Sequence, residues 1–180
     1  MGDMDRAFET YQQVLAIESY RLGLSHPDVT VTLHNIATID AARGNHEHAL
    51  SLYKQVLTLQ RKLFGDDDES LAVTSACMGD VYERMGDNDN ATDCFEEALR
   101  IKMFTLGRHS LEVARLFHKL GKLSLARDDY PLAEICVSKA LMVYRMNHLT
   151  DDDDWVVDAN RDAANIDAAI AMGRGIKFEC

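Results

Sequence analysis

The stretch TLHNIATIDAARGNHEHALSLYKQVLTLQRKLFG, residues 32–65, carries apolar side chains at helical spacing on both sides of a glycine. In its second half, Ala49, Tyr53 and Val56 follow the i, i+4, i+7 pattern of one helix face. Gly44 separates this half from the first. The stretch therefore predicts two amphipathic helices, A and B, joined by a tight turn.

The same pattern recurs along the chain with a period of 42 residues, marked by Gly23, Gly65 and Gly107. Side-chain size is kept at equivalent positions, as in Ala37/Gly79/Gly121, Ala49/Ala91/Ala133, Tyr53/Phe95/Val137 and Gly44/Gly86/Asp128. A fixed period of this length is typical of repeat proteins. We expect Gly23, Gly65 and Gly107 to end successive B helices in the left-handed αL conformation.

Small residues on the A helices and polar residues before them fit this assignment. Gly79 and Gly121 leave room for the larger residue of helix B, because small side chains allow helices to approach closely. Asp68 and Ser110 stand where an A helix should begin, and both are good N-caps.

Charge and composition exclude several classes of function. The 180 residues include 30 acidic and 19 basic side chains, for a formal net charge of −11, which argues against a nucleic-acid surface. No apolar stretch approaches the roughly 20 residues that span a bilayer, so membrane insertion is not expected. The N-terminus has no signal-peptide pattern, and the four cysteines lack zinc-ligand spacing. We therefore expect reduced thiols and a cytoplasmic protein.

The size pattern of Ile36-Ala37, Ala49, Tyr53 and Val56, matched by Met78-Gly79, Ala91, Phe95 and Ala98, resembles the tetratricopeptide repeat. The usual period of that motif is about 34 residues. The longer form found here resembles the repeats of kinesin light chains, and the resemblance covers Gly2 to about Leu149. It implies an all-α fold, a right-handed solenoid of about eight antiparallel helices.

The register divides the chain into repeats within one domain. We expect a half repeat with a lone B helix at 1–25, full repeats at 26–67, 68–109 and 110–150, a capping A-like helix at 151–172 and a mobile tail at 173–180. A B helix without its A partner suggests a fragment of a longer protein.

The resemblance also implies a ligand surface, because A helices line the concave side of this fold. The residues expected to bind a peptide there are His34, Asn35, Thr38, Cys77, Asp80, Arg84, Arg115, His118, Lys119 and Lys122. The last four gather on one helix face by their i, i+3, i+4, i+7 spacing. This basic stripe could hold an acidic segment or a terminal carboxylate. The alternative is a solvated face balanced by acids such as Asp80 and Glu83.

Two residue patterns with which related repeats bind a peptide are only partly present on this surface. The positions with which chaperone-binding relatives clamp a carboxylate read His34, Thr38, Cys77, Arg115 and Lys119, so the asparagines are missing. Asn35 falls where long repeats often carry an asparagine that binds a ligand's backbone. The later repeats have Cys77 and Lys119 there, so a full ladder is not expected.

No combination of residues predicts catalysis. We find no nucleophile–base pair and no phosphate loop, and the calcium-like start at Gly86 lacks its acidic twelfth position, which is Ala98. We expect no enzyme activity, no metal and no cofactor. The predicted function is a non-catalytic scaffold or adaptor that binds a partner's peptide segment. The alternative is a structural module that forms homo-oligomers through Tyr11, Val14 and Leu15 of its first helix.

Overall fold

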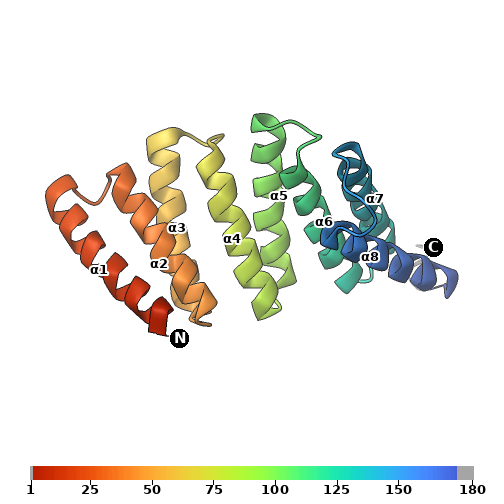
Figure 1. Cartoon of the computed structure of the whole chain (residues 1–180), viewed down its shortest axis with the longest axis horizontal. Coiled ribbons are helices and arrows are strands. Elements are labelled where there is room, and N and C mark those ends of the chain that lie inside the picture. Colours follow the sequence, from red (N-terminus) through yellow and green to blue (C-terminus); the bar gives the residue numbers. More distant parts are fainter. Residues whose placement is uncertain (1, 174–180) are drawn as a thin grey trace, which may run out of the picture. The chain divides into compact units, whose positions relative to one another are not determined.

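The computed structural model describes residues 2–173, which form eight helices and no strand (Figure 1). In chain order these are α1 (Gly2–Leu22), α2 (Pro27–Ala42), α3 (His46–Phe64), α4 (Glu69–Met85), α5 (Asn88–Thr105), α6 (Leu111–Ala126), α7 (Tyr130–Met146) and α8 (Asp154–Ala171). The all-α prediction is confirmed for this part of the chain. The tail predicted to be mobile falls, from residue 174 on, outside the described residues.

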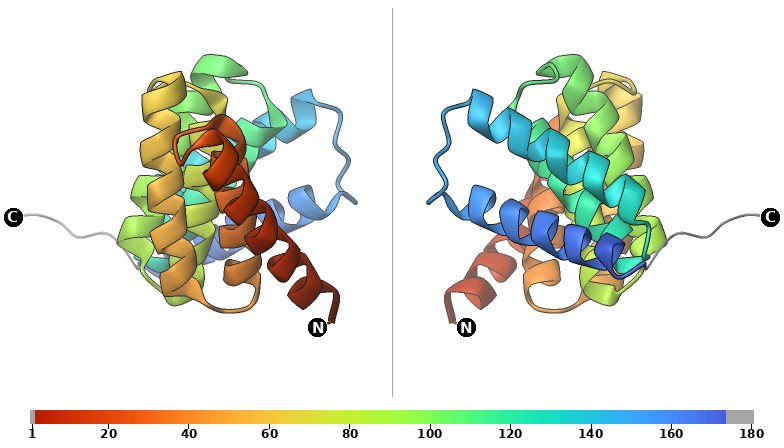
Figure 2. Two further views of the ribbon diagram at one scale, coloured as in Figure 1. Left: turned by 90° about the vertical axis from the view of Figure 1, so that its left-hand side faces the viewer. Right: turned by 90° about the vertical axis from the view of Figure 1, so that its right-hand side faces the viewer.

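The helices form two compact units, one up to Cys94 and the other from Phe95. In the first unit α2 contacts α1, α3 and α4, and α3 also contacts α4. In the second unit α6 and α7 contact each other, and α8 packs against both of them (Figure 2, right). In the first unit α2 thus touches both its B helix α3 and the next A helix α4, and in the second unit α6 touches α7 and α8 in the same way.

Aromatic and small side chains fill the cores as the register predicts. Tyr53 is 1% exposed and Ala49 is fully buried in the first unit. In the second unit Ala133 and Val137 of α7 belong to one core cluster with Ile166 of α8. The last helix therefore buries part of its apolar surface in the core of this unit.

Gly121 lies at the closest approach of α6 to α7. A Cβ atom added to Gly121 would lie 2.7 Å from Cγ2 of Val137 and 3.4 Å from the carbonyl oxygen of Ala133. This contact confirms the prediction that a helix-A glycine makes room for the helix-B side chain at the equivalent position.

Capping side chains mark the starts of the A helices. The side chains of Asp68 and Ser110 accept hydrogen bonds from the backbone N–H groups of Ser70 (2.9 Å) and Glu112 (3.2 Å), which confirms both predicted N-caps. His26 plays the same part for α2, because its Nδ1 accepts from the N–H of Asp28 at 3.2 Å.

The backbone conformations of the glycines that end the B helices differ in part from the prediction. Gly23, Gly65 and Gly107 all have positive φ, but Gly65 combines φ 88° with ψ 176°, which is extended and outside the αL region. The αL prediction for Gly65 was therefore wrong. A helical ψ would continue the turn, whereas the extended one directs the chain toward Asp68, which caps the next helix. Gly86 at the A–B turn, with φ 76° and ψ 9°, does adopt αL.

Asp128 occupies the slot of Gly44 and Gly86 and also has positive φ, at 60°. Its Oδ1 accepts a hydrogen bond of 2.6 Å from the hydroxyl of Tyr130. A side-chain bond thus accompanies a backbone conformation that is costly for a residue with a Cβ atom.

Candidate functional site

In the first unit the predicted site residues lie on α2 and α4, two A helices in contact. Thr38 and Arg84 are exposed, whereas His34, Asn35, Cys77 and Asp80 are half-buried. Val31 and Val73, one repeat apart, are 60% and 42% exposed. We call the surface formed by these side chains the α2–α4 face.

Tyr53 of α3 supports the α2–α4 face from below. Its ring packs edge-on against His34, with 5.3 Å between centroids, and its hydroxyl oxygen lies 3.0 Å from Oγ1 of Thr38. Burial raises the pKa of Tyr53 to about 12, and the nearby Cys77 and Asp80 act in the same direction. The phenol therefore stays protonated near neutral pH and can keep its hydrogen bond.

His34 connects α2 to α4, since its Nδ1 lies 3.2 Å from Oγ1 of Thr74. Burial lowers the pKa of His34 below its ordinary value of 6.5. The imidazole is therefore mostly neutral at pH 7, and its orientation is set by Tyr53 and Thr74 together.

Sequence reasoning missed Tyr53 and Thr74. Tyr53 was assigned to the core, and its register equivalents Phe95 and Val137 carry no hydroxyl. The only available signal was that hydroxyl, because a buried tyrosine usually needs a hydrogen-bond partner.

In the second unit the basic stripe lies along α6, and two of its members already contact α8. The guanidinium of Arg115 lies 4.8 Å from the centre of the Trp155 ring. Nε2 of His118 lies 2.8 Å from Oδ2 of Asp162, and the two side chains are only 12% and 16% exposed. Part of the stripe is therefore engaged within the chain.

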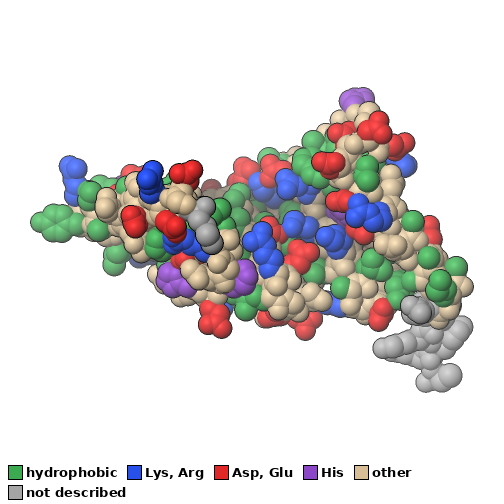
Figure 3. Space-filling model, turned by 60° about the horizontal axis from the view of Figure 1, so that its bottom comes forward, with side chains coloured by type: hydrophobic (Ala, Val, Ile, Leu, Met, Phe, Trp, Pro, Cys, Tyr) green, Lys and Arg blue, Asp and Glu red, His purple; other side chains and the backbone are tan. Residues whose placement is uncertain are grey.

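The other two members differ in burial. Lys119 is half-buried, with Nζ 5.0 Å from the centre of the Phe95 ring, and Lys122 is exposed. Figure 3 shows Lys and Arg side chains close to acidic ones on the face that it draws. The spacing argument thus placed the four residues on one helix, whereas their partners on α8 were not foreseen.

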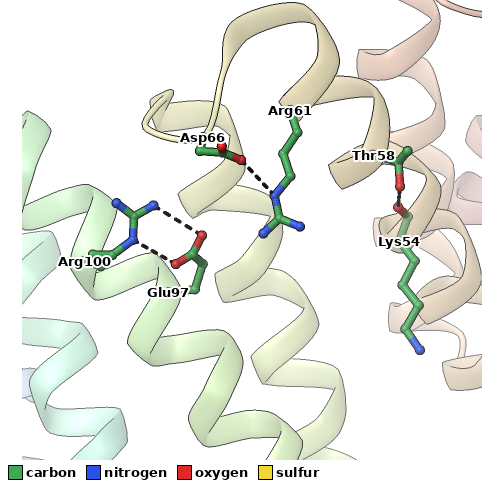
Figure 4. A network of polar contacts seen from close by, with 6 residues as sticks. All are labelled: Lys54, Thr58, Arg61, Asp66, Glu97 and Arg100. Atoms are coloured by element: carbon green, nitrogen blue, oxygen red, sulfur yellow. Dashed lines mark hydrogen bonds and ion pairs between the residues drawn. The ribbon is translucent and has the colours of Figure 1, made fainter.

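Three polar contacts on or beside the B helices α3 and α5 join residues that are close in sequence (Figure 4). On α3 the hydroxyl of Thr58 donates to the carbonyl oxygen of Lys54 at 2.9 Å. On α5 Nε of Arg100 lies 2.9 Å from Oε2 of Glu97, three residues earlier. Arg61 at the end of α3 pairs with Asp66 at 3.4 Å. Exposed pairs of this kind contribute little, typically about 0–1 kcal/mol.

Surface pockets lie elsewhere. A pocket of about 500 Å³ follows α7 beside Met142 and Met146, and one of about 470 Å³ lies at the α2–α3 turn beside His46 and Met85. A third, of about 340 Å³, adjoins Trp155. The predicted site residues line none of the three.

Two of the described thiols are held in their protonated form. Burial raises the pKa of Cys94 to about 11 and also raises that of Cys136, so both thiols stay protonated and weakly nucleophilic. Within residues 2–173 no group of three or more His, Cys, Asp or Glu side chains could hold a metal ion. Over the same residues, no helix has both the length and the apolar character needed to cross a bilayer.

Paired helices with a period of 42 residues, small residues at their contacts and polar side chains on the A helices define a helical-repeat protein. The chain belongs to the tetratricopeptide repeat family, whose sequence model matches residues 1–62 and 69–146. Proteins of this family are generally protein–protein interaction scaffolds and typically non-catalytic.

Solved structures share the fold at low sequence identity. The putative kinesin light chain TPR-like repeats of Podosopora anserina match with a TM-score of 0.78 and 20% identity, over 95% of this chain and 81% of that one. BtubC (BKLC) from P. vanneervenii matches with a TM-score of 0.83 and 20% identity, over 99% of this chain and 70% of that one. MamA matches with a TM-score of 0.58 and 17% identity, over 95% of this chain and 92% of that one. The fold is thus similar to kinesin-light-chain-like repeats, as predicted. No curated protein sequence matches the chain.

Proposed function

We propose that this chain is a non-catalytic scaffold that binds a peptide segment of a partner protein on its A-helix surface. In the first unit this surface is the α2–α4 face, and in the second it is the exposed side of α6. The proposal takes the repeats as 26–67, 68–109 and 110–150, whose A helices begin at the caps His26, Asp68 and Ser110.

The main support is the preorganisation of the α2–α4 face. Tyr53 and Thr74 hold His34 and Thr38 in place through side-chain contacts. A ligand that binds such a surface loses its own conformational freedom, but the receptor has little left to lose. Exposed Val31 and Val73 add apolar surface beside these polar groups.

The stripe on α6 supports a more specific proposal, that an acidic part of the ligand lies there. Arg115, Lys119 and Lys122 carry three positive charges on one helix of a chain whose net charge is −11. Such a local field attracts acidic segments and weakens as salt screens it over about 10 Å at 0.1 M.

A peptide array with blocked termini tests the whole proposal. Wild-type protein should bind a defined subset of extended peptides, and acidic peptides should bind less well as salt increases. The double change Lys119→Glu/Lys122→Glu should remove the acidic peptides from that subset. Arg108→Glu/Arg145→Glu is the matched control, because it makes the same charge change at exposed positions off the stripe. If both double variants bind the same peptides as wild type, the stripe plays no part.

The competing proposal is self-association through α1. The structure places the predicted contact residues Tyr11, Val14 and Leu15 half-buried on this helix, whereas Ile17 and Tyr20 are 57% and 92% exposed. A concentration series in light scattering separates the two proposals: a constant monomer mass would remove self-association, whereas a mass that rises and is reduced by Tyr20→Glu would support it. The reduced cysteines Cys94 and Cys136 support the cytoplasm as the proposed compartment.

A further inference from the structure

The proton of the Thr74 hydroxyl has a definite acceptor. Oγ1 of Thr74 lies 3.1 Å from the carbonyl oxygen of Ser70, one turn earlier on α4. A carbonyl can only accept, and a hydroxyl has one proton to donate. When Thr74 donates to Ser70, its oxygen can meet Nδ1 of His34 only as an acceptor.

The proton of His34 must then be on Nδ1, because the 3.2 Å contact between Nδ1 and Oγ1 needs a donor. A neutral imidazole carries one N–H, so Nε2 is left with a lone pair. Burial, which lowers the pKa of this side chain, favours that neutral form.

Nε2 of His34 is open to a ligand. The buried side-chain polar atoms without a partner in residues 2–173 are Nδ1 of His46 and Oε1 of Gln60. Nε2 of His34 is absent from this pair, and it has no hydrogen-bond partner in the described structure, so it reaches solvent. It adjoins exposed Val31 and Thr38, which lie three residues before and four after it on α2.

We propose that His34 is a specificity-determining residue that accepts, through Nε2, a hydrogen bond from a donor group of the bound peptide. The donor is a lysine side chain or a backbone N–H. The nearby carboxylate of Asp80, which acts on the same Tyr53 hydroxyl, adds negative charge to this face and favours the lysine. The α2–α4 face therefore selects against acidic groups, in contrast to the stripe on α6. This inference rests on the proposed function, because it names the ligand group that this surface takes.

The proton position can be measured without any ligand. In ¹⁵N-labelled wild-type protein, long-range ¹H–¹⁵N correlation spectra should show His34 with a protonated Nδ1 and an unprotonated Nε2. Thr74→Val removes the acceptor and should move the proton, wholly or in part, to Nε2. Thr58→Val is the matched control, because Thr58 makes the same bond to the carbonyl four residues earlier but lies away from His34. A wild-type spectrum with the proton on Nε2 would overturn the proposal.

Peptide pools then identify the donor. We would compare blocked, randomised short peptides whose central residue is Lys, norleucine, Glu or an N-methylated residue. One neutral hydrogen bond changes affinity by roughly 3- to 10-fold. If lysine is the donor, the Lys pool exceeds the norleucine pool by that factor. If the donor is the backbone, only the N-methylated pool weakens.

The variants decide whether His34 is responsible. In Thr74→Val the preference should shrink, whereas Thr58→Val should keep it, since neither variant changes the charge. If wild type and Thr74→Val show the same affinity ratios between the peptide pools, the inference is overturned and the scaffold proposal still stands. If no pool binds wild type, the scaffold proposal fails and the ligand role of His34 fails with it.

Discussion

His118 of α6 and Asp162 of α8 face each other with 2.8 Å between Nε2 and Oδ2, and both side chains are more than four-fifths buried. The pair ties the last helix to the A helix of the preceding repeat. Because removing one partner leaves a poorly solvated polar group behind, such a pair matters more for folding than an exposed ion pair.

Asp162→Ala should therefore lower the free energy of unfolding by about 1–3 kcal/mol. Asp158→Ala is the control, because Asp158 pairs with Arg161 on the exposed side of the same helix, and this change should cost less than about 0.5 kcal/mol. Urea unfolding at pH 7 measures both. Equal losses would show that the buried pair contributes no more than the exposed one.

Gly121→Ala should destabilise the second unit by about 1–3 kcal/mol through overpacking. The new Cβ atom would lie 2.7 Å from Cγ2 of Val137, whose branched side chain has little freedom to move away. Val137→Ala removes that methyl group, so the double variant should be more stable than the sum of the single changes implies. Strict additivity in the double-mutant cycle would place the strain elsewhere.

Tyr53 and Tyr144 should lose their phenol protons at a higher pH than a solvent-exposed tyrosine does. Burial raises the pKa of Tyr53 and of Tyr144 to about 12 from the ordinary value of 10.0, and Arg115 partly offsets the effect at Tyr144. Between these values the unfolded chain loses the proton that the folded chain keeps, so stability is full below pH 10 and falls as pH rises toward 12. Phenolate absorbance of the folded protein should show this late component, and Tyr53→Phe and Tyr144→Phe should each remove part of it. A titration complete by pH 10.5 would contradict both assignments.

Asp128 should tolerate glycine better than alanine. With φ at 60°, a residue with a Cβ atom is strained by roughly 1–2 kcal/mol. Asp128→Ala keeps this strain and loses the bond from Tyr130, whereas Asp128→Gly loses the bond but relieves the strain. Thermal unfolding should place the glycine variant above the alanine variant, with Tyr130→Phe reporting the bond alone. The reverse order would mean that the backbone here is unstrained.

The repeat register predicted the parts of the fold that depend on residue size. Ala133 and Gly121 each stand at a register position that holds a small residue in every repeat. Contacts within the repeat unit require a small side chain at such positions, so the requirement recurs with the period of the sequence. The caps Asp68 and Ser110 were predictable because their role is local. The conformation of Gly65 was not predictable, because its ψ angle depends on the direction that the chain takes toward the next helix.

The candidate site was predictable as a set of positions and not as a set of interactions. Spacing alone places Arg115 and His118 on one face of a helix. Their contacts with Trp155 and Asp162 come from α8, which lies outside the residues that the repeat model matches. Periodicity carries no information about contacts made by a unit that departs from it.

The phenol of Tyr53 belongs to the buried interior, yet its hydroxyl oxygen lies 3.0 Å from Oγ1 of Thr38, a residue of the proposed peptide-binding face. Packing the interior and forming a ligand surface are two separate purposes in a repeat scaffold. Here one residue serves both. If the α2–α4 face binds a peptide as proposed, replacing Tyr53 should alter the ligand preference although this side chain is only 1% exposed.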